Sequence, residues 1–201
     1  MIDAYIRPFI DPPLTRVGVL VAKTKISANT VTLIGFIFGL TAMLSIALGY
    51  PALGGFFFII NRISDGLDGG VARATKMSDF GGYLDIMSDF IIYPGLPLAF
   101  CFYDPTFILP AAFLIFAMAG AMTSFLAYAI LCAKNNITDD ARGKKSFYYL
   151  GGVCEGFETF LFLGLMCFFP QSFPTLALIF GVLCLCTTVG RILQTQAAFK
   201  N

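Results

Sequence analysis

Four aspartates in one short segment have the spacing of a metal site. Asp65 and Asp68 stand three residues apart, and Asp85 and Asp89 stand four apart. In α-helices these spacings place the two members of each pair on one face. An antiparallel hairpin that turns near residues 76–77 would set Asp68 opposite Asp85 and Asp65 opposite Asp89. All four carboxylates are therefore predicted to converge at one depth.

Such a cluster requires neutralisation. Two like charges about 4 Å apart repel by roughly 4 kcal/mol at an effective dielectric constant near 20. One or two divalent cations would remove this repulsion. The chain has no histidine, and ligands that are all oxygen atoms favour Mg²⁺ or Mn²⁺ over zinc. Two such ions can clamp a diphosphate and stabilise phosphoryl transfer.

The residues beside the aspartates fit a phosphate-bearing ligand. Gly69 and Gly81 adjoin the two pairs, where the missing side chain lets a ligand approach the backbone. Arg73, one helical turn after Gly69, could bind phosphate through its planar guanidinium. Simpler interpretations exist, because glycines in membrane helices often serve close packing and Arg73 could be a charge anchor. Asp79 is better explained as a helix cap or turn residue.

The rest of the chain predicts a membrane domain. Apolar residues make up 58% of the 201 residues and charged residues only 12%, against about 25% in typical soluble domains. The apolar residues form blocks of membrane-span length. We therefore expect an all-α integral membrane protein with six transmembrane helices. The predicted spans are residues 31–48, 52–73, 80–103, 108–133, 147–169 and 175–197.

Charge placement predicts the orientation. Every Lys and Arg except Arg62 falls on the side of the termini and the aspartate-rich turn, whereas the opposite loops contain none. The positive-inside rule places this side, with both termini, in the cytoplasm. Residues 1–26 mix apolar and basic side chains, which predicts an interfacial segment broken near Pro12 and Pro13; a flexible tail is the alternative. Residues 27–201 would form the membrane domain.

The segment "DGLDGGVARATKMSDFGGYLDIMSD" resembles the signature of the CDP-alcohol phosphotransferase family, D-x2-D-G-x2-A-R-x8-G-x3-D-x3-D. The matching residues are Asp65, Asp68, Gly69, Ala72, Arg73, Gly81, Asp85 and Asp89. Seven residues rather than eight separate Arg73 from Gly81, and this shortening falls in the predicted turn. The segment "SANTVTLIG" is similar to the family's Asn-x-x-Thr pattern at the start of the first span.

The resemblance implies six transmembrane helices, a homodimer, and two divalent metal ions, Mg²⁺ or Mn²⁺. It also implies that an alcohol hydroxyl displaces CMP from a CDP-linked donor. Asp65, Asp68 and Asp85 would be metal ligands, and Asp89 both a ligand and the general base, with Arg73 as a second catalytic residue. The residues expected at the CDP moiety are Asn29, Thr32, Asp65, Gly69, Ala72, Arg73 and Gly81.

The substrates are less defined by the sequence. CDP-diacylglycerol is the favoured donor because the site adjoins apolar spans, although a soluble CDP-alcohol with a lipid acceptor fits the same motif. Glu155 and Glu158, expected two to three turns inside the fifth span, would hold a polyol or amine acceptor or pair with Arg62 or Arg191. Arg142 and Arg191 could instead hold a phosphate-bearing acceptor.

Other classes of protein fit less well. "NRISD" and "DIMSD" have the N-x3-D and D-x3-D patterns of aspartate-rich membrane prenyltransferases, but those enzymes resemble one another in carrying the two motifs far apart. A membrane cation transporter would place its carboxylates nearer the bilayer midplane, often with internal repeats, and no repeat is visible here. The net charge of +1 gives no basic surface for nucleic acid.

Overall fold

The computed structural model describes residues 3–135 and 152–199, and every regular element in these ranges is helical. Arg142 and residues 147–151 of the predicted fifth span lie outside them. The helices are α1 (Asp3–Lys23), α2 (Ala28–Ala47), α3 (Pro51–Ala74), α4 (Asp79–Tyr103), α5 (Ile108–Lys134), α6 (Gly156–Phe168) and α7 (Phe173–Ala198), with short 3-10 turns η1 (Pro105–Phe107) and η3 (Pro170–Ser172).

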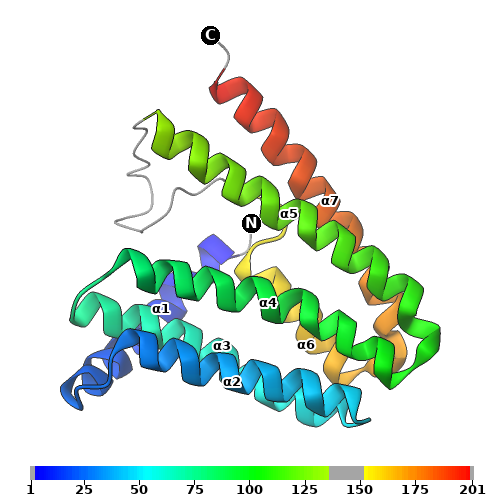
Figure 1. Cartoon of the computed structure of the whole chain (residues 1–201), viewed down its shortest axis with the longest axis horizontal. Coiled ribbons are helices and arrows are strands. Elements are labelled where there is room, and N and C mark those ends of the chain that lie inside the picture. Colours follow the sequence, from blue (N-terminus) through cyan, green and yellow to red (C-terminus); the bar gives the residue numbers. More distant parts are fainter. Residues whose placement is uncertain (1–2, 136–151, 200–201) are drawn as a thin grey trace.

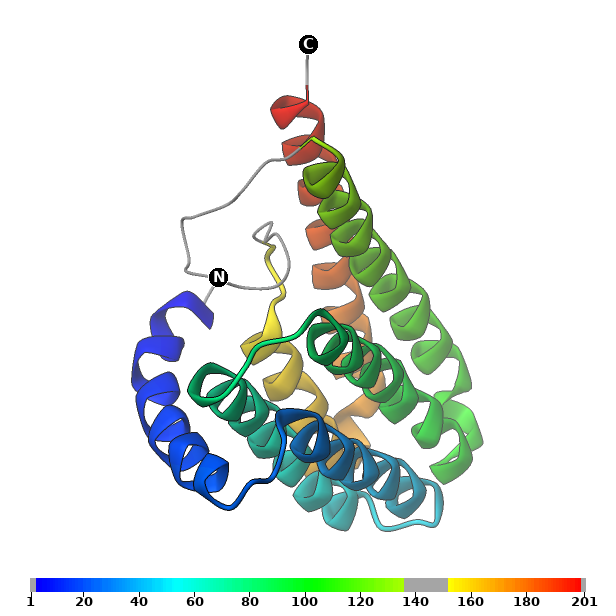
Figure 2. The ribbon, with the colours of Figure 1, turned by 60° about the vertical axis from the view of Figure 1, so that its left-hand side comes forward.

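The helices form two groups that meet at α4. Helices α2, α3 and α4 lie side by side, and α1 packs against α3 on the outside of this group (Figure 1). Helices α5 and α7 form a second pair, joined to the first group by contacts between α4 and α5. Figure 2 shows α6 inside the bundle, between α3 and α7. The site described below lies where α2, α3 and α4 come together.

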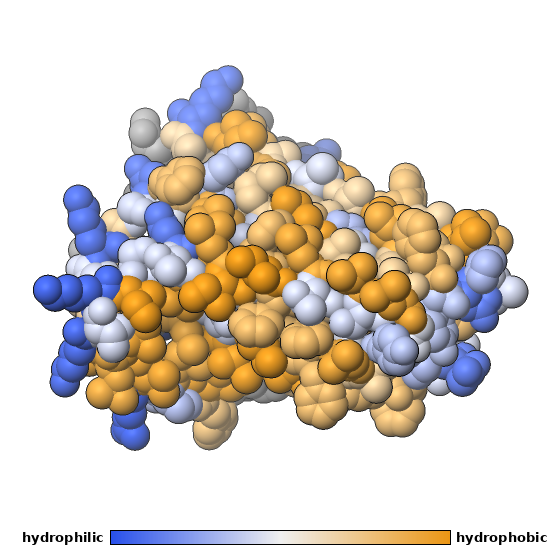
Figure 3. Space-filling model, turned by 60° about the horizontal axis from the view of Figure 1, so that its bottom comes forward, coloured by the Kyte–Doolittle hydropathy of each residue, from blue (hydrophilic) through white to orange (hydrophobic). Residues whose placement is uncertain are grey.

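The surface is that of a membrane protein. Four segments are long and apolar enough to cross a bilayer, namely α2, α4, η1 with α5, and η3 with α7. Apolar side chains cover most of the face in Figure 3, and hydrophilic ones gather at its two ends. The prediction of an all-helical membrane fold is confirmed. The number of six spans and the orientation of the termini stay predictions.

Two helices differ from a standard span. Helix α3 carries Arg62 at its middle and Asp65 and Asp68 in its second half, which lowers its hydropathy. Helix α6 has 13 residues, a length of about 20 Å, whereas the hydrocarbon core of a bilayer is about 30 Å thick.

The expected break at Pro12 and Pro13 is wrong. Helix α1 runs without interruption from Asp3 to Lys23 with both prolines inside it. Proline removes a backbone donor and opposes the helix locally, but most helical stability in proteins comes from tertiary packing. The second half of α1 packs so closely on α3 that a Cβ atom on Gly18 would lie 2.6 Å from the carbonyl carbon of Gly70. This contact supports the continuous helix.

The expected start of the fifth span is also wrong. Helix α6 begins at Gly156, so Glu155 is its N-cap residue and Glu158 lies in its first turn. The two glutamates form a reciprocal capping box, in which the backbone N–H of Glu155 donates to the Glu158 carboxylate at 3.2 Å. These carboxylates satisfy N–H groups that the helix leaves unpaired at its start. They therefore sit at the end of the helix rather than two to three turns inside it.

The predicted hairpin between α3 and α4 is present. Helix α3 ends at Ala74, and Ser78 caps α4 by accepting a hydrogen bond from the backbone N–H of Gly81 at 3.0 Å. Asp79 lies exposed in the first turn of α4. The short turn brings the aspartates of the two helices face to face.

Candidate active site

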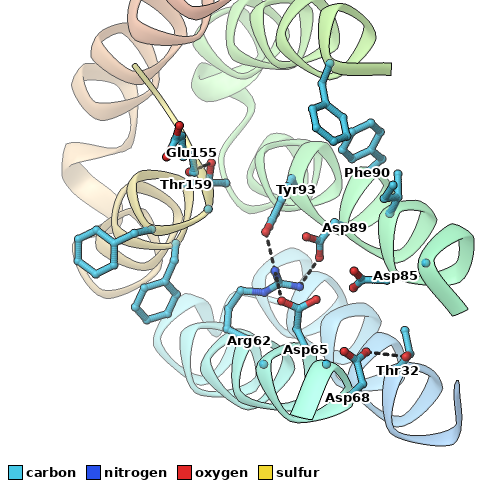
Figure 4. A pocket seen from close by; sticks show the side chains of 18 of the residues that line it. Thr32, Arg62, Asp65, Asp68, Asp85, Asp89, Phe90, Tyr93, Glu155 and Thr159 are labelled. Atoms are coloured by element: carbon cyan, nitrogen blue, oxygen red, sulfur yellow. Dashed lines mark hydrogen bonds and ion pairs between the residues drawn. The ribbon is translucent and has the colours of Figure 1, made fainter. Parts of the chain in front are cut away.

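Three of the four aspartates meet as the spacing predicts. Asp65 and Asp68 from α3 and Asp85 from α4 place carboxylate oxygens within 4.8 Å of one another. They line a cavity of about 710 Å³ (Figure 4). Ligands that are all carboxylate oxygens, brought this close, fit a hard divalent cation such as Mg²⁺ or Mn²⁺.

Thr32 supports this group directly. Its hydroxyl donates to Oδ2 of Asp68 at 2.5 Å, and both side chains are buried. Thr32 was expected at the nucleotide, and it does line the cavity. The hydrogen bond also makes Thr32 a direct partner of Asp68, a candidate metal ligand.

Asp89 has a different partner. Its Oδ1 accepts a hydrogen bond from Nη2 of Arg62 at 2.6 Å, and Nη1 of the same guanidinium donates to the Tyr93 hydroxyl at 2.5 Å. Nη1 also lies 3.5 Å from Oδ2 of Asp65. Asp89 lines the same cavity as the other aspartates but stands outside the group of three that meet within 4.8 Å. Its assignment as a metal ligand and base stays a prediction.

The residues predicted at the CDP moiety also line the cavity that contains the aspartates. A Cβ atom on Gly81 would lie 3.0 Å from Oδ1 of Asn29, and one on Gly69 would lie 3.3 Å from Nη1 of Arg73. Nη2 of Arg73 donates to the Thr15 hydroxyl of α1 at 3.2 Å. The predicted residues that line the cavity are Asn29, Thr32, Asp65, Gly69, Ala72, Arg73 and Gly81.

Of the predicted acceptor residues that the structure describes, two line the cavity and one does not. Glu155 and Arg191 line the cavity, with Glu155 across it from Asp89 in Figure 4. Arg191 is buried, donates from Nη1 to the carbonyl of Ala121 at 2.8 Å, and lies over the Phe125 ring. Glu158 is buried in the capping box and does not line the cavity.

Sequence reasoning missed two residues of the site. Arg62 was considered only as a partner for the glutamates, and Tyr93 was not considered. A signal was present, because Arg62 precedes Asp65 by three residues and Tyr93 follows Asp89 by four. Both spacings place these side chains on the faces that carry the aspartates.

Comparison with known proteins decides the family. Residues 25–196 match the CDP-alcohol phosphatidyltransferase family. The chain belongs to this family. The sequence resemblance is thereby confirmed, and the chain is a CDP-alcohol phosphatidyltransferase rather than a prenyltransferase or a cation transporter.

Individual relatives of this phosphatidyltransferase differ in how much of it they match. The inner membrane protein YnjF of Escherichia coli is 41% identical over 202 residues, covering 100% of this chain and 98% of that protein. The archaetidylinositol phosphate synthase of Pyrococcus horikoshii is 41% identical over 85 residues, 42% of this chain and 45% of that enzyme.

Solved structures share the fold. The phosphatidylinositol phosphate synthase of Mycobacterium tuberculosis with CDP-DAG bound has a TM-score of 0.73 at 17% identity, over 94% of this chain and 97% of that one. The same enzyme in complex with manganese and citrate has a TM-score of 0.72 at 16% identity, over 94% and 92% of the two chains. At this level of identity the likeness concerns the fold.

Proposed function

We propose that this phosphatidyltransferase transfers a phosphatidyl group from CDP-diacylglycerol to the hydroxyl of an alcohol and releases CMP. The observation that carries the proposal is the meeting of Asp65, Asp68 and Asp85 in one cavity of a chain of this family. Apolar side chains cover most of the face shown in Figure 3, which favours a donor with lipid chains. The synthase of the same fold binds CDP-DAG.

The aspartates would hold two Mg²⁺ or Mn²⁺ ions, with Asp65, Asp68 and Asp85 as ligands and Asp89 as a fourth ligand that is also the general base. When bound, such ions offset the negative charge of the donor diphosphate. Asn29 and Ala72 would contact the CDP moiety, and the bare backbone at Gly69 and Gly81 would allow its close approach.

The chemistry required of the chain is modest. The acceptor oxygen attacks the phosphorus that carries the diacylglycerol, and the bond from that phosphorus to the CMP oxygen breaks. CMP leaves with the electron pair of that bond, and the hydroxyl proton passes to the Asp89 carboxylate. Arg73 would donate hydrogen bonds to the diphosphate through its planar guanidinium. Holding acceptor and donor side by side accounts for much of the expected acceleration.

The acceptor would enter from the α6 end of the cavity. Glu155 and Thr159 lie there, across the cavity from Asp89 (Figure 4), and Arg191 lines the same space. Carboxylate and hydroxyl groups suit a polyol or an amine, whereas Arg191 suits a phosphate. We further propose six spans, a homodimer, and an active site that faces the cytoplasm.

The test is CMP release by the purified protein with Mn²⁺ or Mg²⁺ and CDP-diacylglycerol. Glycerol phosphate, inositol phosphate, inositol, serine and glycerol serve as acceptors, and CDP-choline with diacylglycerol represents the soluble donors. We expect metal-dependent CMP release with one acceptor, abolished by Asp89→Asn and retained by Asp104→Asn, which alters a carboxylate at the far end of α4. Turnover only with CDP-choline would make the donor assignment wrong. Release from neither donor, without CDP binding, would contradict the proposed function.

A further inference from the structure

Arg62 is a nearly buried cation in the centre of the site. Its side chain is 12% exposed, and each guanidinium nitrogen has a partner. Nε donates to Oδ1 of Asn61 at 2.9 Å, Nη1 to the hydroxyl of Tyr93 and Nη2 to Oδ1 of Asp89. A buried charge is tolerated when it is paired and hydrogen-bonded in this way.

The surrounding structure fixes the guanidinium plane. Nδ2 of Asn61 donates to the carbonyl of Gly35 in α2 at 2.9 Å, which ties the arginine's partner to a second helix. The guanidinium carbon lies 4.9 Å from the ring centre of Tyr93 and 5.8 Å from that of Phe58. Helices α2, α3 and α4 therefore all contribute to holding Arg62 in one orientation.

This arrangement acts more strongly on Asp89 than on Asp65, because Nη2 lies 2.6 Å from Oδ1 of Asp89 whereas Nη1 lies 3.5 Å from Oδ2 of Asp65. Charged hydrogen bonds from a planar guanidinium fix both the distance and the direction of a carboxylate. One oxygen of Asp89 is engaged by Arg62, and the carboxylate stands next to the group formed by Asp65, Asp68 and Asp85 rather than within it. Figure 4 shows Asp89 facing into the cavity between that group and the α6 end. The acceptor hydroxyl must arrive in this region.

We propose that Arg62, braced by Tyr93, is a positioning residue that holds the Asp89 carboxylate at the acceptor side of the site. The inference rests on the proposed function, in which Asp89 takes the acceptor proton. Arg62 touches neither substrate in this proposal and acts through Asp89. Its loss should therefore slow the chemical step and leave nucleotide binding in place.

The test separates turnover from binding in Arg62→Gln. We expect kcat for CMP release to fall about 10- to 100-fold, since small misplacements of catalytic groups have costs of this order. KM for CDP-diacylglycerol and Mn²⁺-dependent CDP binding should stay within about 3-fold of wild type, because Arg62 contacts Asp89 and not the nucleotide in this proposal. Arg62→Lys keeps the charge without the planar fork and should recover part of kcat. Arg16→Gln, an exposed arginine of α1, is the matched control and should match wild type.

Tyr93→Phe provides a second line of evidence that leaves the Arg62–Asp89 ion pair in place. It should lower kcat by a smaller factor, and its effect should not add to that of Arg62→Gln, because groups acting through one network are coupled. Unchanged kcat in Arg62→Gln would overturn the inference, and if Arg62→Gln does not fold, unchanged kcat in Tyr93→Phe would do so. In either case, turnover by the wild type would still support the proposed function. Loss of CDP binding together with kcat would also overturn it. Absence of wild-type turnover would instead refute the proposed function itself.

Discussion

At the residue scale, a single hydroxyl supports the candidate metal site. Thr32 donates to Oδ2 of Asp68 at 2.5 Å in a buried setting. Thr32→Val keeps the shape of the side chain and removes the donor. Loss of a hydrogen-bond donor to a metal ligand typically lowers metal affinity or activity about 10- to 100-fold. We expect the Mn²⁺ concentration for half-maximal CMP release to rise within that range.

The control for this variant lies about two and a half turns along the same helix. The Thr41 hydroxyl donates to the carbonyl of Ile37 within α2 at 2.8 Å, so Thr41→Val removes a hydroxyl far from the aspartates. Its Mn²⁺ requirement should equal that of wild type. An equal Mn²⁺ requirement in Thr32→Val and Thr41→Val would show that the hydrogen bond to Asp68 does not support metal binding.

At the scale of elements, the backbones of α1 and α3 approach each other so closely that they leave little space for a side chain between them. A Cβ atom on Gly70 would lie 2.9 Å from the backbone oxygen of Leu14, and a backbone atom cannot yield as a flexible side chain can. Overpacking of this kind costs about 1–3 kcal/mol. Gly70→Ala should therefore lower the midpoint of thermal unfolding in detergent. It should also weaken CDP binding, because α1 places Leu14 and the Thr15 partner of Arg73 beside the cavity.

Gly164→Ala is the matched control. A Cβ atom there meets nothing within 4 Å, and alanine favours a helix interior by up to about 1 kcal/mol over glycine. Its unfolding midpoint should equal or exceed that of wild type. If Gly70→Ala unfolded at the same temperature as Gly164→Ala, the α1–α3 contact would not contribute to stability.

The elements also show what the sequence can predict. Long apolar blocks located α2, α3, α4, α5 and α7 to within about three residues, and the helical spacing of Asp65, Asp68 and Asp85 correctly placed them together. Local signals failed where distant groups decide the outcome. The prolines of α1 were outweighed by packing on α3, and the start of α6 depends on two glutamate carboxylates that cap it. The pairing of Arg62 with Asp89 joins two helices, which spacing within either helix does not reveal.

At the scale of the whole molecule, the distribution of charge predicts the topology. In the sequence, every Lys and Arg except Arg62 falls in segments predicted to lie on the side of the termini and the α3–α4 turn, and the turns predicted on the opposite side carry none. We expect alkaline phosphatase to be inactive when fused after Asn201 and active when inserted after Asp104 or Gln171. Activity at Gln171 requires that the segment containing α6 crosses the membrane. Phosphatase activity at the C-terminus would contradict the orientation, and inactivity at Gln171 would contradict six spans.

The most direct test of the metal site measures Mn²⁺ binding to the purified chain in the presence of CDP. The concentration of free Mn²⁺ is obtained from its electron paramagnetic resonance signal. We predict two bound ions for the wild type. Asp68→Asn and Asp85→Asn should each weaken binding by at least about 100-fold, more than the loss of a hydrogen-bond donor to a metal ligand does, whereas Asp79→Asn should bind as wild type does. Equal Mn²⁺ binding by Asp68→Asn, Asp85→Asn and the wild type would contradict the assignment of these aspartates as the metal site.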